Sequence, residues 1–207
     1  MSQNRKVCMK TGKMRVSINA PVVLGIVGIS FAATLLGYIT GGITSRVIFT
    51  TYRSALWSPM TYLRAFTHIF GHADWQHFVG NMSYLLLLGP MLEEKYGSRT
   101  LAGVVAVTAF STSFVNYVLF PNVALCGASG VVFAFILLSS FTSFKQGEIP
   151  LTFILVSVIF IGQQIFEGIF VRDNVSNLSH IVGGIVGGFL GYEFNLRQRD
   201  GSSVSKN

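Results

Sequence analysis

The stretch VALCGASGVVFAFILLSSFTSF, residues Val123–Phe144, contains no charged residue and is long enough to cross a bilayer as one helix. Near its start, Gly127-Ala128-Ser129-Gly130 places a serine among small residues. A second uncharged apolar run, Val175–Tyr192, carries His180 near its own start. A serine and a histidine inside apolar segments are groups that a hydrolase working within a membrane would need. These two runs therefore direct the interpretation of both fold and function.

The composition of the 207-residue chain is that of a membrane protein. Hydrophobic residues make up 51% of it and charged residues 11%, whereas a soluble domain carries about 25% charged residues. The mean hydropathy is +0.57. Such a chain predicts an all-α polytopic membrane protein that lies in a lipid bilayer.

Apolar runs predict six transmembrane helices. Besides the two runs above, the segments are Ala20–Ile39, Phe78–Leu92, Leu101–Phe120 and Ile149–Phe166. The second of these reaches spanning length only if the helix starts at Trp75. The long connection Gly41–Asp74 is rich in aromatic residues, which favour the membrane–water interface. We expect this connection to lie in the outer interfacial zone without crossing.

Basic residues predict the orientation. The first fifteen residues contain five Lys and Arg residues and no acidic residue, which favours a cytoplasmic N-terminus. With six spans, both termini are expected in the cytoplasm and the chain is a multi-pass protein of the cell membrane. The net charge of +7 is explained by this tail and the inner loops, so we expect no nucleic-acid partner. The predicted parts are a basic tail at 1–19, a helical core at 20–196 and a tail at 197–207.

Two cysteines add little to the functional prediction. Cys8 falls in the predicted cytoplasmic tail and Cys126 near the outer end of the fourth span, so they are not expected to form a disulfide. Cys126 precedes Ser129 by three residues and is an alternative nucleophile. A buried cysteine more often serves as a small hydrophobic residue, and that interpretation is favoured.

The positions of Ser129 and His180 within their runs predict a similar depth. At 1.5 Å per residue, Ser129 lies roughly 9 Å beyond Val123 and His180 roughly 8 Å beyond Val175. Both are therefore expected below the outer face. A neutral imidazole within hydrogen-bonding distance can accept the serine proton and later return it to a leaving amine.

His77 and Asn81 are spaced i, i+4 and so share one face of the second predicted helix. Acyl transfer requires donors directed at the developing oxyanion. The amide of Asn81, an N–H of His77 and the backbone N–H of Ser129 could form such a set. The alternative is that the two side chains hydrogen-bond between helices and serve packing alone.

Glycines follow His180 at intervals of four residues. Gly183, Gly187 and Gly191 form a small-residue stripe that permits close helix crossing. Packing is the ordinary meaning of such a stripe. Here it would also bring His180 towards Ser129, with Gly130 as part of the matching surface.

In this order, the motifs resemble those of the rhomboid family of intramembrane serine proteases. Residues 127–130 match its Gly-x-Ser-Gly motif, and residues 180–187 match its His-x-x-Gly-x-x-x-Gly motif. His72, His77 and Asn81 match its His-x4-His-x3-Asn pattern. The resemblance covers roughly residues 20–195.

Two further segments carry the same resemblance. Arg64, with Thr67 and His68, is similar to a segment of the family's long first external loop. Glu93 followed by Gly97 is similar to the end of the second helix. The resemblance implies that Arg64 and Glu93 are structural residues.

The resemblance implies a rhomboid-like fold and a Ser129–His180 dyad without a third acidic member. It further implies that His77, Asn81 and Gly127 support the oxyanion site, and that Gly183 and Gly187 are structural. Neither a metal nor a cofactor is implied. Because Ser129 and His180 are expected close to the outer ends of their helices, we expect the substrates to be single-span membrane proteins that are cleaved near the outer surface. We also expect small side chains at the cut, because the glycines near Ser129 and His180 make the site crowded, and a helix-weakening Gly or Pro below the cut, because it lowers the cost of unwinding the substrate helix.

Three positions differ from common members of the family. Phe133 replaces a tyrosine four residues after the serine, and it can stack on His180 but offers no hydroxyl. Leu63 precedes Arg64 where a tryptophan is common, and Ser179 precedes His180 where many bacterial members have alanine. None of these differences removes a catalytic group.

Other classes fit the sequence less well. A zinc intramembrane protease needs His-Glu-x-x-His, but Phe78 follows His77. An aspartyl protease needs two membrane-buried aspartates, whereas Asp74, Asp173 and Asp200 fall at or beyond predicted helix ends. A transporter usually shows internal repeats, and this sequence shows none. The main alternative is an inactive rhomboid-fold protein that binds and escorts membrane proteins.

Overall fold

The computed structural model describes residues 17–141, 149, 151–170 and 174–204. Within these ranges every regular element is a helix. The described residues contain one isolated antiparallel bridge, between Thr51 and Leu125. The prediction of a helical architecture is confirmed for this part of the chain.

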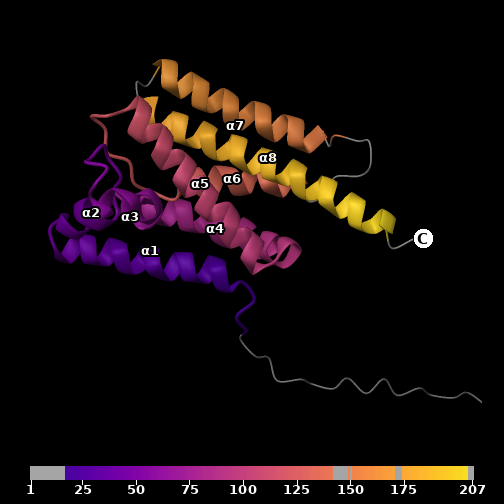
Figure 1. The fold of residues 1–207 in the computed structure, drawn as a ribbon, viewed down its shortest axis with the longest axis horizontal. Helices are drawn as coiled ribbons and strands as arrows, with labels where there is room; N and C mark the ends of the chain where they lie inside the picture. The colour runs from indigo at the N-terminus through magenta and orange to yellow at the C-terminus, as the bar shows by residue number, and fades with distance from the viewer. Residues whose placement is uncertain (1–16, 142–148, 150, 171–173, 205–207) are drawn as a thin grey trace, which may run out of the picture.

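Six longer helices of the described chain fall on the six apolar runs. They are α1 (Pro21–Ile39), α4 (Trp75–Tyr96), α5 (Ser98–Leu119), α6 (Ser129–Ser140), α7 (Leu151–Phe170) and α8 (Asn174–Val204). In Figure 1, α1 and α7 lie on opposite sides of the bundle and the other four helices lie between them. The long connection forms α2 (Ile43–Ile48), α3 (Pro59–Thr67) and the 3-10 helix η1 (His68–Phe70).

Among the described residues, two helices have the length and apolar composition needed to cross a membrane, and these are α1 and α5. Helix α6 and the segment Leu151–Phe160 are apolar but shorter. Helix α4 has 22 residues, yet Gln76, His77 and Asn81 reduce its hydropathy. Length and composition of the described helices thus support two spans, and the six-span topology stays a prediction.

Helix α6 starts later than predicted. The sequence predicts a helix from Val123, but the first helical residue is Ser129. Leu125 pairs with Thr51 through two backbone hydrogen bonds, of 2.8 and 2.9 Å, and the Gly127 N–H donates to the His68 carbonyl at 2.9 Å. Gly127 has a φ of +123°, which lies outside the helical region. The predicted start at Val123 is wrong, so Ser129 does not follow six helical residues.

Helix α6 forms the centre of the core. Ala134, Phe135 and Leu138 are fully buried. Against α6, helix α8 presents Gly183 and Gly187. A Cβ at these positions would overlap the backbone carbonyl oxygens of Gly130 and Ala134, respectively. The absence of side chains allows the two backbones to touch, as small-residue stripes permit.

Glu93 links the start of α1 to the end of α4. Its carboxylate accepts hydrogen bonds from the Val22 and Val23 N–H groups, at 3.0 and 3.1 Å, and from the Ser98 hydroxyl at 2.7 Å. The first N–H groups of a helix have no intrahelical acceptor and carry a partial positive charge. A buried carboxylate at this position therefore caps α1 while holding it against α4.

Arg64 connects parts of the long connection. Its Nε donates to the Val47 carbonyl at 2.8 Å, and its guanidinium carbon lies 4.4 Å from the centroid of the Tyr52 ring. The Thr67 hydroxyl also donates to the Ile48 carbonyl. These contacts hold α3 against the end of α2 and against Tyr52, which follows it.

Candidate active site

A cavity of about 340 Å³ lies among α4, α6 and α8. Its lining residues are His77, Gly80, Asn81, Tyr84, Ser129, Val132, Phe133 and His180. The fold thus brings the four polar residues singled out in the sequence, Ser129, His180, His77 and Asn81, to the wall of one cavity. They come from three helices that are far apart in the chain.

Helix α4 supplies one wall. His77, Gly80, Asn81 and Tyr84 are three or four residues apart and so share a helix face. The carboxylate of Asp74 caps the helix by accepting from the His77 N–H at 2.7 Å. This cap fixes His77 in the first turn of α4.

The amide nitrogen of Asn81 is buried without a hydrogen-bond partner. Its side chain is 7% exposed, and its Nδ2 makes no hydrogen bond in the described structure. A buried donor that stays unpaired costs about 1–3 kcal/mol. A group that accepts from this donor would recover that cost. Asn81 is therefore a candidate donor to a molecule bound in the cavity.

Ser129 is the first residue of α6. The first backbone hydrogen bond of the helix runs from the Val132 N–H to the Ala128 carbonyl, at 2.9 Å. The N–H groups of residues 129–131 precede it and have no acceptor within the helix. The hydroxyl thus stands at a positively polarised helix terminus, where donors could stabilise an oxyanion. The sequence prediction missed this feature because it started the helix six residues earlier.

Gly127 brings the backbone before Ser129 against α4. A Cβ at this position would lie 2.6 Å from His77 Cε1, 2.7 Å from His77 Nε2 and 3.6 Å from Asn81 Nδ2. Its positive φ also disfavours other residues. Only glycine allows this close approach, which sets Ser129 beside the two polar side chains of α4.

His180 stacks on Phe133. The two rings are parallel within 5°, with centroids 4.4 Å apart. Phe133 follows Ser129 by one helical turn and meets Phe160 of α7 edge to face, at 5.5 Å. The stack fixes the plane of the imidazole next to the serine turn.

His72 lies behind this wall. Its ring meets His77 edge-on at 5.1 Å, and its Nδ1 lies 3.2 Å from the Phe70 carbonyl oxygen. Burial, with a smaller contribution from His77, lowers the pKa of His72 to about 4. The imidazole is therefore neutral at neutral pH and packs beside His77 without a charge.

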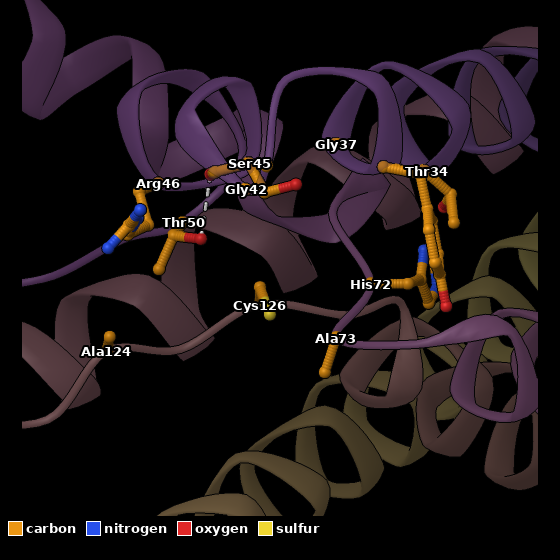
Figure 2. Close-up of a pocket in the computed structure, with 12 residues that line it drawn as sticks. Thr34, Gly37, Gly42, Ser45, Arg46, Thr50, His72, Ala73, Ala124 and Cys126 are labelled. Carbon is orange, nitrogen blue, oxygen red and sulfur yellow. Dashed lines mark hydrogen bonds between the residues drawn. The ribbon is translucent and has the colours of Figure 1, made fainter.

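A larger cavity, of about 560 Å³, lies on the other side of His72, bordered by α1, α2 and the segment before Ser129. Figure 2 shows Cys126 and His72 opposite Ser45 and Thr50, and the Thr50 hydroxyl donates to the Ser45 carbonyl at 2.9 Å. Neither Ser129 nor His180 lines this space. Because the chemistry requires these two groups, the smaller cavity is the candidate active site.

Cys126 lines the larger cavity and not the smaller one. Burial raises the pKa of its thiol, and the contact with Thr50 offsets part of this effect. A cysteine acts as a nucleophile through its thiolate, so the raised pKa disfavours the alternative nucleophile. Cys8 lies outside the described residues.

Comparison with known proteins identifies the family. A family model for the Rhomboid domain matches residues 59–196, about two thirds of the chain. The chain belongs to the rhomboid family. Rhomboid-related protein 1 of Caenorhabditis elegans is 32% identical over 135 residues, which cover 61% of this chain and 38% of that relative.

Two further relatives extend the comparison. Rhomboid-related protein 2 of Mus musculus is 32% identical over 161 residues, covering 65% of this chain and 51% of the relative. Rhomboid-like protein 11, chloroplastic, of Arabidopsis thaliana is 24% identical over 135 residues, covering 58% and 48%. This rhomboid chain spans about half or less of each relative's length.

Three cavity residues of this rhomboid were not predicted from the sequence. They are Gly80, Tyr84 and Val132. Helical spacing from His77 and from Ser129 carries a signal for them, since residues three, four or seven positions apart share a face. That signal was available but does not distinguish a cavity wall from a helix contact. Within the described ranges, no group of three or more His, Cys, Asp or Glu residues could hold a metal ion.

Proposed function

We propose that this rhomboid is an intramembrane serine endopeptidase that cleaves single-span membrane proteins near the outer surface of the cell membrane. The observation that carries the proposal is the single cavity lined by Ser129, His180, His77 and Asn81. A nucleophile, a base and candidate oxyanion donors are the parts that acyl transfer requires. Membership of a family that includes serine proteases supports the same assignment.

In the proposed reaction, the Ser129 hydroxyl oxygen attacks the scissile carbonyl carbon while His180 accepts the hydroxyl proton. Collapse of the tetrahedral intermediate breaks the C–N bond, and His180 returns the proton to the leaving amine. Water then attacks the acyl-enzyme, with His180 again as the base, and releases the acid and Ser129. The dyad has no acidic third member, and the Phe133 stack orients the imidazole.

The proposed oxyanion site combines three sources of donors. They are the Asn81 Nδ2, an imidazole N–H of His77 and the first backbone N–H groups of α6. The helix terminus adds a favourable partial charge. Because Gly127 holds the serine turn against both α4 side chains, these donors are already arranged before a substrate binds.

A catalytic assay with substitutions tests the mechanism. The protein, reconstituted in liposomes with a single-span reporter, is expected to lose at least about 10⁴-fold in turnover with Ser129→Ala or His180→Ala. Cys126→Ala serves as the control and is expected to retain cleavage. A fluorophosphonate should label Ser129, and labelling should require His180.

Either of two outcomes would contradict the proposed function. Undiminished turnover of Ser129→Ala would exclude this serine as the nucleophile. Binding of membrane proteins by wild-type protein with no cleavage of any reporter would favour the inactive rhomboid-fold binding protein instead.

We further propose six spans with both termini in the cytoplasm. The basic N-terminal residues support this orientation, and six helices of the described chain fall on the apolar runs. In a Cys126→Ala background, a membrane-impermeant thiol reagent is expected to modify Cys8 only after the cytoplasmic face is opened. Labelling of Cys8 in sealed cells would contradict the orientation.

A further inference from the structure

The imidazole of His77 is positioned by the groups that pack around it. The backbone N–H of His77 donates to the Asp74 carboxylate, which fixes the start of α4 but leaves the side chain free to rotate. Two segments contact the ring. A Cβ at Gly127 would overlap its Cε1 and Nε2 atoms, and the His72 ring meets it at a centroid distance of 5.1 Å and an interplanar angle of 72°. The direction of the imidazole therefore depends on these neighbours.

His72 is itself held in one orientation. Its Nδ1 lies 3.2 Å from the Phe70 carbonyl oxygen, which can only accept a hydrogen bond, and this assigns the proton to Nδ1. Phe78 meets the His72 ring edge to face at 5.5 Å, with the two planes at 90°. With its side chain only 4% exposed, His72 offers His77 a fixed surface.

Phe78 belongs to an aromatic cluster that joins α4 to α1. Trp75 meets Phe78 at 5.5 Å, and Phe31 of α1 meets these two rings at 5.8 and 6.1 Å, respectively. Tyr38 of α1 also stacks on Trp75, at 5.6 Å. Each such pair contributes about 0.5–1.5 kcal/mol beyond the area it buries. The support behind His72 therefore comes from two helices and not from α4 alone.

The second ring nitrogen of His72 makes no hydrogen bond. Nε2 is buried without a partner in the described structure, and an unpaired buried polar atom costs about 1–3 kcal/mol. What His72 offers to His77 is thus the contact of a ring. The hydrogen bond to Phe70 and the ring contact with His77 are separate properties, and different substitutions can remove each of them.

We propose that His72 is a positioning residue of the active site, whose ring holds the imidazole of His77 towards the cavity that Ser129 lines. This inference rests on the proposed protease function, in which an N–H of His77 stabilises the oxyanion. Such a donor acts in the transition state, so a misdirected His77 lowers kcat and leaves KM nearly unchanged. Because His72 does not line this cavity, its effect on the reaction is expected to pass through His77.

The test is a double-mutant cycle on kcat, measured with a single-span reporter in liposomes. His72→Ala is expected to lower kcat about tenfold, with KM unchanged within about twofold, because small displacements of a catalytic group have effects of this order. In a His77→Ala background, the same change is expected to lower kcat less than about twofold, since the donor that His72 positions is then absent.

Two further variants separate the ring from the hydrogen bond. His72→Phe keeps a ring, lacks the N–H, and can extend into the cavity of about 560 Å³ that His72 lines. It is expected to retain kcat within about threefold of wild type. His72→Asn keeps an N–H for the Phe70 carbonyl but has no ring, and it is expected to be about as slow as His72→Ala. Thermal unfolding in detergent is measured for each variant, so that kcat is compared between folded proteins.

Phe153→Ala is the matched control. Phe153 of α7 meets Phe141 at 4.7 Å with the planes at 62°, and neither ring lines the cavity of Ser129. The substitution removes a comparable ring contact at the end of α6 opposite to Ser129. Its effect on kcat is expected to be the same with and without His77.

The outcomes separate this inference from the proposed function. Effects of His72→Ala and His77→Ala that multiply, or a His72→Asn variant as active as His72→Phe, would overturn the positioning role and leave the protease assignment intact. Coupling of equal size between Phe153→Ala and His77→Ala would also overturn it. Absence of any Ser129-dependent cleavage by the wild-type protein would overturn both.

Discussion

The two sides of the candidate active site use glycine in opposite ways. On the α6–α8 side, Gly183 and Gly187 let two backbones touch, so that a single methyl group would overlap a carbonyl oxygen. On the α4 side, Gly80 leaves a space that no neighbouring atom fills. The first arrangement brings His180 of α8 against the helix that begins with Ser129. The second arrangement leaves open space at Gly80 in the wall of the cavity that Ser129 and His180 also line.

This difference separates the requirements of chemistry from those of binding. Reacting groups need fixed positions, because a displacement of about 1 Å can cost about 10²-fold in rate. A binding wall needs space that matches the substrate. The same residue type meets both requirements, and the atoms opposite each glycine decide which one it serves.

Among the substitutions that test this comparison of the two sides, the largest effect is expected at the polar part of the α4 wall. Asn81→Ala should lower kcat about 10²–10³-fold, with little change in KM, because loss of one oxyanion donor has that effect. Asn81→Asp, which keeps the shape but removes the amide donor, should be similarly slow, and His77→Ala should also be slow. Steady-state kinetics with a single-span reporter provides the measurement. Wild-type turnover in Asn81→Ala and His77→Ala would support a packing role for these side chains.

The tight side is tested by adding one methyl group. Gly187→Ala should destabilise the protein by about 1–3 kcal/mol or more and lower activity up to about 10²-fold, because its Cβ would overlap the Ala134 carbonyl. The next residue provides the control, since a Cβ at Gly188 meets nothing within 4 Å. Thermal unfolding in detergent and reporter cleavage are measured together. If the two alanine variants behave alike, close backbone contact is not what holds these helices.

Stability should also fall in acid because of His68, whose carbonyl accepts a hydrogen bond from the Gly127 N–H just before α6. Burial lowers the pKa of His68 to about 4, below its unfolded value of about 6.5. The unfolded state therefore binds the proton more readily between these values. The contribution of His68 to the free energy of unfolding is therefore fully present above about pH 6.5. It declines towards pH 4, by up to about 1.4 kcal/mol per pH unit.

This pH dependence can be assigned by substitution. Denaturant unfolding is measured at pH 7.5 and pH 5, and His68→Gln should reduce the difference between them. His72, whose pKa is also lowered to about 4, accounts for a remaining part. An unchanged difference in His68→Gln would show that this histidine does not carry the effect.

The smallest effect is expected at Phe133, where the two sides meet. Phe133→Leu removes the ring that stacks on His180 at 4.4 Å, and loss of an aromatic pair costs about 0.5–1.5 kcal/mol, roughly a 2- to 10-fold loss of activity. Phe133→Tyr keeps the ring and should stay close to wild type. The kcat of the two variants is compared across pH 5–9. A larger loss with tyrosine than with leucine would show that stacking is not the contribution of this residue.

The positions of the helices could be predicted because hydropathy is a local property. Uncharged apolar runs of sufficient length form helices in a bilayer whatever their neighbours are, and each run carries a helix in the described chain. The spacing of His77 and Asn81 likewise fixes them on one face. The family could be recognised from the order of short motifs, and the match to the Rhomboid domain confirms it.

The start of α6 could not be predicted in this way. The residues before Ser129 are as apolar as those after it, and hydropathy alone continues the helix. Their backbone instead pairs with Thr51 and His68, residues of a distant connection. This pairing moves Ser129 from the inside of a helix to its N-terminus.

The sequence by itself thus determined the helical composition, the family and the residue types available for chemistry. Only the tertiary structure decided which side chains line one cavity, where the serine stands on its helix and which glycines face atoms or open space. The physical reason is that the propensity of a segment depends on its own residues, whereas a cavity depends on groups that several segments bring together. Gly80 and Gly187 illustrate this, since each is a helical glycine among apolar residues and only their surroundings distinguish them.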